Sequence, residues 1–390
     1  MSAPRILVSV SPGEVRVALL RGDRLDEAWV ERPARPDGVG DLQRARVTAL
    51  APAMAGAFLV LAGGETGFLP ESEAGPVRQP IGKSVQEGLV LPVRVTRAAQ
   101  GGKGPRVTAR LKPEEAARAA AAPAGTMPLL LARGPDAALR LARTHGDATV
   151  LTDGAAIATR LRAALGAGRV ALSPRPVFDD ALEAEFEMLA GPEVPLPGGG
   201  RILIHPTPAL TALDVDAGAA AGERDAHSQF RVNEAAVVEA ARQIRLRQLA
   251  GPILLDLAGM TQKRRAALAE PLAKALAPDH LVRLLGLGPL GLFEMLRQRI
   301  HPPLHEVLAG PLTPGLAALR QAVREAAAMP GRRLALRAAP AVLAALEALP
   351  GALAEAAAAI GQPLQLRPDP LRSGPDAWGD TLIEEAGHGG

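Results

Sequence analysis

The sequence predicts a multidomain α/β protein that includes a small all-β barrel. Short strand-like runs with Gly-rich turns occupy residues 4–111, and helix-like and strand-like runs alternate from residue 127 to the end. The length of 390 residues exceeds one ordinary domain of roughly 150 residues, so several folding units are expected. A content of 48% hydrophobic and 22% charged residues is typical of a globular chain and argues against general disorder.

Residues 4–111 are predicted to be almost entirely β. Three strands in 4–31 show apolar alternation and are separated by two short Gly-containing turns, and a Pro- and Gly-rich hinge follows at 32–45. Five further strands with Gly-rich turns fit a small Greek-key barrel, of which the OB fold is the common case. The five candidates are RVTAL, GAFLVLAG, GFLPE, LVLPVRVTRA and RVTARL.

The pattern changes to alternating helices and strands after the barrel. Residues 112–126 are rich in Ala, Pro and Glu and are predicted to be a linker. Residues 127–196 begin with the strand MPLLLA and continue with three helices and the strands TVLTD and RVALSP. Residues 311–390 again alternate helix and strand, with the segments GLAALRQAVREAAA, RRLALRAA, PAVLAALEAL and PLQLRP.

Residues 197–310 are predicted to form a further α/β unit. Three helices are expected here, over Asn233–Leu249, over Gln262–Leu276 and from Leu292 onward. The predicted strands are RILIHPT, ALTALDVD, GPILLDLAG and HLVRLLGLG.

Composition excludes several classes of chemistry. Because Cys is absent, disulfides, thiolate-bound zinc and a cysteine nucleophile are excluded, and we expect no zinc. The 44 Lys and Arg exceed the 41 Asp and Glu by a net charge of +3, which permits a nucleic-acid partner without requiring one. Only six Phe and two Trp are present and Tyr is absent, so the place of each aromatic ring is informative.

Neither a targeting segment nor a membrane span is predicted. Charged residues such as Arg5, Glu14 and Arg16 interrupt the apolar positions near the N-terminus, which argues against a signal peptide. The uncharged run 47–64 reaches the roughly 18 residues at which a membrane helix is considered. Because it contains Pro52 and many Ala and Gly, two strands and a turn are the better prediction. We therefore expect a cytoplasmic protein with no membrane partner.

Three aspartates form the first candidate site. Asp214 and Asp216 lie two apart in the strand LTALDVD, so their side chains point to the same face. Asp256 lies in an apolar strand one helix later, and this spacing predicts two parallel strands that lie close together. Converging carboxylates repel one another unless a cation such as Mg²⁺ neutralises them. The alternative is that they are strand-end caps or salt-bridge partners of the Arg-rich helix at 233–249.

The second candidate site lies in the predicted barrel. Phe58 and Phe68 are ten residues apart on adjacent predicted strands, and Lys103 lies in a Gly-rich basic loop. Exposed rings on an OB sheet stack nucleic-acid bases, and a nearby Lys binds phosphates. The alternative is that both rings fill the core of the barrel.

Two further motifs are better explained by structure than by chemistry. The run Gly286–Gly291 matches G-x-G-x-x-G after a predicted strand, but it lies late in the chain, and Pro289 removes an N–H that would face a pyrophosphate. A tight turn is the better interpretation. His301 and His305 are four apart, but two prolines lie between them, so a helical metal site is not expected.

The order of these segments resembles the catalytic half of the ribonuclease E/ribonuclease G family. The resemblance runs in order from about residue 4 to 310 and more weakly to about 380. The two aspartate segments together with the EMLRQR ending are specific. The matching segments are ILVSVSPGEVRVALLRGDRL, VTALAPAMAGAFLVLAGGETGFLP, KGPRVTARL, PLPGGGRILIHPTPALTALDVDAG, EAARQIRLRQLAGPILLDLAGM and LGPLGLFEMLRQR.

The resemblance implies an architecture as well as site residues. Asp214 and Asp256 match the two Mg²⁺-binding aspartates of the family, and Phe58, Phe68 and Lys103 match positions that contact RNA. The implied domains are an RNase H-like subdomain from 1–36 and 127–196, an inserted RNA-binding OB domain at 37–111, a linker at 112–126, a DNase I-like catalytic subdomain at 197–310, and a small C-terminal domain at 311–390.

Four departures from the family pattern qualify this expectation. Asp216 stands where the family usually has Asn, which adds negative charge and removes an amide donor. The Cys pair that links family subunits through zinc is absent, so a zinc-linked tetramer is excluded while a homodimer stays open. The linker at 112–126 stands where the family's 5′-sensor domain is expected, and Pro289 replaces an Arg of the same sensor pocket.

We expect a Mg²⁺-dependent endoribonuclease that cleaves single-stranded RNA, in RNA processing or decay, without sensing a 5′-monophosphate. Asp214, Asp216 and Asp256 would be catalytic, with Asp214 and Asp256 holding the metal, and Arg242 or Arg245 would contact the RNA backbone. One alternative is a catalytically silent RNA-binding protein of the same family. Another is a phosphodiesterase acting on small nucleotides, which would not need the barrel.

Overall fold

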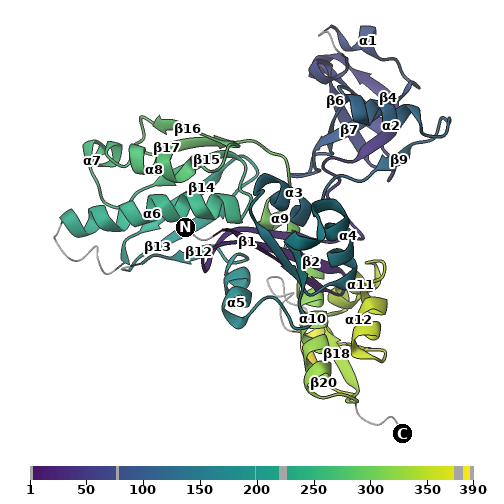
Figure 1. The fold of residues 1–390 in the computed structure, drawn as a ribbon. Coiled ribbons are helices and arrows are strands. Elements are labelled where there is room, and N and C mark those ends of the chain that lie inside the picture. Colours follow the sequence, from purple (N-terminus) through teal and green to yellow (C-terminus); the bar gives the residue numbers. More distant parts are fainter. Residues whose placement is uncertain (1–2, 76–78, 198, 219–225, 373–380, 387–390) are drawn as a thin grey trace. The chain divides into compact units, whose positions relative to one another are not determined.

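The chain forms two compact units, each built from segments that are distant in the sequence (Figure 1). The first unit comprises Met1–Pro36, Ala137–Ala190 and Val307–Gly390, and the second comprises Asp37–Asp136 and Gly191–Glu306. The computed structural model describes residues 3–75, 79–197, 199–218, 226–372 and 381–386.

A five-stranded mixed sheet forms one part of the first unit. Its strands are β1 (Arg5–Ser11), β2 (Glu14–Arg21), β3 (Arg24–Glu31), β10 (Thr149–Thr152) and β11 (Val170–Leu172). They lie in the order β11-β10-β1-β2-β3, with β1 to β3 antiparallel and β10 and β11 parallel to β1. The accompanying helices are α3 (Ala137–Thr144), α4 (Ala155–Leu165) and α5 (Asp180–Met188). Apolar residues such as Ile6, Val17 and Leu161 form the core, and the predicted strands and helices are confirmed.

The C-terminal segment of the first unit builds a three-stranded sheet. Its elements are α10 (Leu312–Ala328), β18 (Leu334–Ala338), α11 (Pro340–Glu347), α12 (Ala352–Ile360), β19 (Gln365–Pro368) and β20 (Leu382–Glu385). The central β18 is parallel to β19 and antiparallel to β20. Helix α12 and strand β20 are additions to the predicted elements. Within the described residues, no single helix is long and apolar enough to cross a membrane; α11 and α12, bent by 93°, pass that test only together.

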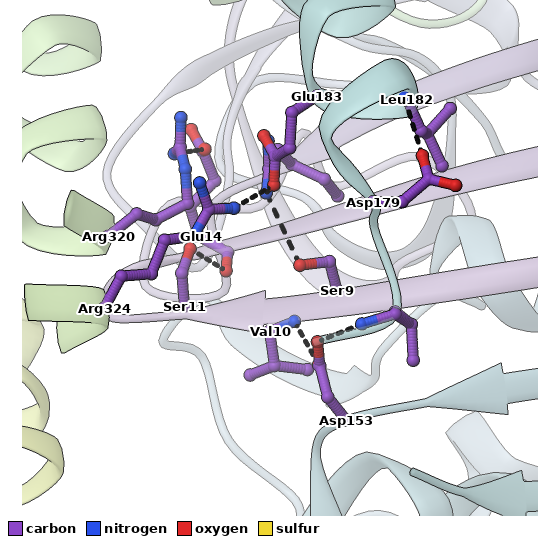
Figure 2. Close-up of polar contacts among 12 residues, drawn as sticks. Ser9, Val10, Ser11, Glu14, Asp153, Asp179, Leu182, Glu183, Arg320 and Arg324 are labelled. Atoms are coloured by element: carbon purple, nitrogen blue, oxygen red, sulfur yellow. Dashed lines mark hydrogen bonds and ion pairs between the residues drawn. The ribbon is translucent and has the colours of Figure 1, made fainter. Parts of the chain in front are cut away.

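Buried ion pairs connect β2 to α5 and α10 in the first unit (Figure 2). Arg16 on β2 donates to both carboxylate oxygens of Glu183 on α5, at 2.6 and 2.8 Å. Arg324 on α10 donates to the same carboxylate, and Arg320 donates to Glu14 at 2.6 Å. Burial acts to raise the pKa of Glu183, but hydrogen bonding to Arg16 and the neighbouring positive charges lower it below its ordinary value. These contacts stabilise the fold of this unit.

A closed five-stranded barrel forms the first part of the second unit. Its strands are β4 (Leu42–Ala51), β5 (Gly56–Val60), β6 (Thr66–Pro70), β7 (Val90–Arg97) and β8 (Arg106–Thr108). Strand β4 pairs with both β5 and β7, which closes the barrel, and β6 is parallel to β8. The arrangement fits an OB-like fold, and all five predicted strands are present. The uncharged run 47–64 lies mainly in the β4–β5 hairpin, as predicted.

A six-stranded sheet with helices on one face forms the rest of the second unit. Its strands are β12 (Glu193–Pro195), β13 (Arg201–Pro206), β14 (Thr211–Asp216), β15 (Gly251–Asp256), β16 (Val282–Leu287) and β17 (Phe293–Arg297), in the order β12-β13-β14-β15-β17-β16. Helix α6 (Ala226–Leu246) connects β14 to the parallel β15. The other helices are α7 (Gln262–Ala266), α8 (Ala269–Leu276) and α9 (Leu304–Val307). Leu213, Ile253 and Phe293 face the helices and are buried.

The structure differs from the predicted elements at several points. The helix expected from Leu292 is strand β17, because Phe293, Met295 and Arg297 are buried in a period of two and pair with β16 and β15. The strand predicted at 127–132 is present as β9 (Leu129–Ala132), but it pairs with β4 of the barrel instead of joining the α/β unit. The single helix expected at 262–276 is broken into α7 and α8. The predicted linker at 112–126 contains the helix α2 (Pro113–Ala120).

Candidate active site and nucleic-acid interface

Two of the three predicted aspartates lie side by side on adjacent strands. Asp214 on β14 and Asp256 on β15 are register partners in a parallel pair, as the crossover spacing predicted. Their chain neighbours Leu213, Val215 and Leu255 are buried against the helices, so both carboxylates lie on the opposite face of the sheet. Asp214 is exposed, and the side chain of Asp256 is 49% exposed.

This pair of carboxylates suits a small divalent cation. Mg²⁺ binds oxygen ligands and usually takes one or two carboxylates, with water and substrate phosphate oxygens at the other positions. Within the described residues, no group of three or more His, Asp, Glu or Cys side chains could hold a metal ion. The donor set of Asp214 and Asp256 therefore fits an ion that is shared with a phosphate, and it does not fit a closed structural metal site.

Arg265 on α7 is a neighbour of this site that sequence reasoning did not identify. Its Nη1 lies 2.6 Å from Oδ1 of Asp256 and also donates to the carbonyl oxygen of Gly291 at 2.8 Å. Its Nε donates to the carbonyl oxygen of Met260 at 3.1 Å. These contacts fix the guanidinium beside one oxygen of Asp256. The basic run Lys263–Arg265, shortly after Asp256, was the available signal in the sequence.

Asp216 has a different environment from the other two aspartates. Its Oδ1 accepts a hydrogen bond from the backbone N–H of Gly218 at 2.9 Å, and its Oδ2 accepts one from Arg201 on β13 at 3.0 Å. The hydrogen bond from Gly218, followed by that from Arg201, lowers the pKa of Asp216 below its ordinary value. Asp216 thus has the contacts of a strand-end cap and a salt bridge, but its partner Arg201 lies on β13 and not on the Arg-rich helix of the alternative interpretation.

The expected RNA contacts of Arg242 and Arg245 are not supported by where these residues lie. Arg242 is buried, and its Nη1 donates to Glu239 one turn earlier on α6, at 2.9 Å. Nη1 of Arg245 donates to the carbonyl oxygens of Ala241 and Ala275, both at 3.3 Å. Both arginines therefore make contacts within the helical layer, whereas the aspartates lie on the other face of the sheet.

Phe58 and Phe68 form an aromatic pair on the outside of the barrel. They are register partners on β5 and β6, with ring centres 5.5 Å apart in an edge-to-face arrangement. Both are half-buried, whereas the intervening Ala57, Leu59 and Leu69 are fully buried in the barrel core. This alternation places the two rings on the outer face, where they are available to stack on bases.

Lys103 lies at the end of the hairpin that joins β7 to β8. The backbone N–H and C=O groups of Gln100 and Lys103 are mutually hydrogen bonded, at 3.0 and 3.1 Å. Gly101 and Gly102 between them have φ of +58° and +70°, a left-handed conformation that Gly adopts without strain. The Gly-rich loop is therefore an ordered turn that presents the exposed Lys103.

The two disfavoured motifs have structural roles. The run Gly286–Gly291 spans the end of β16 and the turn to the antiparallel β17, so no helix follows it and the interpretation as a tight turn is confirmed. The two histidines of the second motif have different surroundings. Nδ1 of His301 lies 2.6 Å from Oδ2 of Asp37. Burial lowers the pKa of His305 below its ordinary value.

Comparisons with known proteins agree on one family. The model of the ribonuclease E/G family matches residues 150–300, a range that includes all three aspartates. Ribonuclease G of Salmonella typhimurium is 26% identical over 78% of this chain and 81% of its own length, and that of Haemophilus influenzae is 26% identical over 79% and 82%. Ribonuclease E of Escherichia coli is 38% identical over 34% of this chain, which corresponds to 13% of that relative. Residues 150–300 thus match the ribonuclease E/G family, and the relatives named ribonuclease G extend the similarity over most of the chain.

Proposed function

We propose that this protein is an endoribonuclease that cleaves single-stranded RNA with the help of Mg²⁺ held by Asp214 and Asp256. The observation that supports this proposal most directly is the side-by-side placement of these two carboxylates on the open face of the sheet. The similarity to relatives named ribonuclease G over most of the chain supports the reaction class. We further propose that the first five-stranded sheet is RNase H-like and the six-stranded sheet DNase I-like.

Each residue at the site has a distinct role in this proposal. Asp214 and Asp256 would provide the oxygen ligands, and Arg265 would hold Asp256 in place through its 2.6 Å contact. When bound, Mg²⁺ stabilises charge on the phosphate and lowers the pKa of a bound water. Asp216, fixed by Arg201 and Gly218, would assist by shaping the edge of the site. Phe58, Phe68 and Lys103 would bind the RNA strand on the barrel.

The proposal extends to the 5′ end of the substrate. The segment that stands where the family's sensor domain is expected contains only α2 as regular structure. We therefore propose cleavage that does not depend on a 5′-monophosphate. A cytoplasmic location and a role in RNA processing or decay follow from the proposed activity.

Cleavage of a fluorescent single-stranded RNA tests this function. We expect cutting with Mg²⁺ and none with EDTA, at similar rates for 5′-monophosphate and 5′-hydroxyl substrates. Asp214→Asn and Asp256→Asn should each lower the rate about 100-fold or more, because each removes a charged oxygen ligand of the metal ion that would stabilise the reacting phosphate. Glu270→Gln, which removes an exposed carboxylate on α8, is the matched control and should retain the rate. Unchanged cleavage by both aspartate variants would refute the proposal.

One observation favours a second candidate, a catalytically silent RNA-binding protein of the same family. Asp216 is held by Arg201, and it adds a carboxylate beside the position where a phosphate would bind. Such a protein would bind the same RNA and show no cutting with Mg²⁺ or Mn²⁺. In that case Asp216→Asn is the first variant to test for restored cleavage.

A further inference from the structure

Four residues form a lateral row across the outer face of the barrel. Phe58 on β5 pairs with Phe68 on β6, Phe68 pairs with Arg106 on β8, and Arg106 pairs with Arg97 on β7. Register partners on neighbouring strands point to the same face, and the register shift between Val95 and Arg97 turns Arg97 away from the inward face of the buried Val95. Neighbouring strands lie about 4.8 Å apart. The row therefore runs from two aromatic rings to two guanidinium groups over roughly 14 Å.

A third arginine joins the end of this row. The charges of Arg106 and Arg299 both act on Arg97, and Arg299 belongs to the segment that follows β17. Residues 98–101 contact the 300–306 segment directly: the N–H of Ala98 donates to the carbonyl of Ile300 at 2.8 Å, and the N–H of Gly101 donates to Glu306 at 3.0 Å. Arg97, Arg106 and Arg299 are called the arginine triad below.

The triad lacks the acidic partners that other arginines of this unit have. Arg94 on the same strand pairs with Glu115 at 3.1 Å, and Arg133 pairs with Asp41 at 2.6 Å. Within the described residues, none of the three triad members makes an ion pair, and the buried Nε of Arg97 has no hydrogen-bond partner.

Such an arrangement is unfavourable for the protein alone. Three like charges repel one another, and burial followed by the charges of the other two arginines lowers the pKa of Arg97. A bound anion would remove this repulsion and supply acceptors for the free N–H groups. Guanidinium groups match the geometry of phosphate oxygens, and the adjacent aromatic rings match bases.

We propose that Arg97, Arg106 and Arg299 form a binding site for a backbone phosphate of the RNA strand whose bases stack on Phe58 and Phe68. This inference rests on the proposed function, because it specifies how that RNA is held. Arg299 of the triad lies beside Gly251, the first residue of β15, because a side chain at position 251 would meet the guanidinium of Arg299. Asp256 ends the same strand five residues later, about 16 Å away. The site would thus anchor the strand at a distance from the reacting phosphate.

Salt-dependent binding of a fluorescent single-stranded RNA, measured by anisotropy in EDTA, tests the triad separately from catalysis. In the triple variant Arg97→Gln, Arg106→Gln, Arg299→Gln we expect about tenfold weaker binding and a slope of log Kd against log salt concentration that is smaller by about 0.7, the value for one phosphate contact on a single strand. Arg118→Gln, on the exposed face of α2, is the control, because it removes one positive charge as each triad substitution does. It should leave the Kd and the salt slope unchanged. Arg106→Lys should retain the slope because it keeps the charge.

Thermal unfolding distinguishes binding from a structural role. Removing mutually repelling charges should leave the melting temperature of the triple variant equal to or above that of the wild type. If the triple variant has a lower melting temperature than the wild type, or a Kd and salt slope equal to those of Arg118→Gln, the proposed phosphate site is refuted. A wild-type protein that binds RNA normally but never cuts it would refute only the proposed nuclease function, whereas one that binds no RNA would refute both.

Discussion

The aromatic pair on the barrel allows a quantitative prediction for RNA binding. Phe58 and Phe68 lie on the outer face with ring centres 5.5 Å apart, and each is half-buried by its neighbours. Stacking of one base on an aromatic ring contributes about 1–3 kcal/mol to binding. Phe68→Ala should therefore weaken the binding of single-stranded RNA by roughly 5- to 150-fold, since about 1.4 kcal/mol corresponds to a factor of ten.

The measurement is a fluorescence anisotropy titration in EDTA, with a double-mutant cycle. The single variants Phe58→Ala and Phe68→Ala should each weaken binding, and their effects should not add, because the two rings touch. Leu69→Val is the matched control, since it alters the buried core next to Phe68 and should lower the melting temperature without changing Kd. If both Phe variants bind RNA within twofold of the wild type while their melting temperatures fall, the rings are core residues and the reasoning is refuted.

The remaining predictions concern charged groups. Asp216→Asn retains an acceptor for the N–H of Gly218 and loses only an exposed ion pair with Arg201. A thermal melt should therefore show little change in stability, and a cleavage assay should show equal or faster cutting. A large loss of stability would contradict this prediction. Glu183→Gln should lower the stability of the first unit by about 3 kcal/mol in a urea titration, because the substitution leaves the buried Arg16 without its carboxylate partner. An unchanged urea midpoint would contradict this prediction. Because the pKa of Glu183 is lowered in the folded state, its contribution is present above pH 4.5 and is lost as the pH falls through the folded value, so the wild type and Glu183→Gln should converge in stability in acid.

Local sequence patterns predicted most elements of this fold. Apolar alternation located all the barrel strands and the three N-terminal strands, since a period of two is a property of the backbone that each strand displays alone. The strand–helix–strand spacing around α6 predicted that β14 and β15 are parallel, and the register then placed Asp214 beside Asp256. The same pattern reasoning failed at Leu292, because a short apolar run after a Gly-rich turn is consistent with either a helix or a strand.

The tertiary structure decided which partner each polar side chain has. Nothing in the local sequence around Asp216 indicates that Arg201 neutralises it, and the basic run Lys263–Arg265 does not say which of its members contacts Asp256, because these contacts depend on strand order and loop path. The same holds for Arg97, which shares the alternation of the buried Val93 and Val95 and comes to face Arg106 only through the register shift between Val95 and Arg97. This register shift, together with the pairing of β8 with β6, puts Arg97 and Arg106 in one row with Phe58 and Phe68. The sequence by itself determined the elements and the chemistry that they offer, whereas long-range strand pairing determined which of those groups meet.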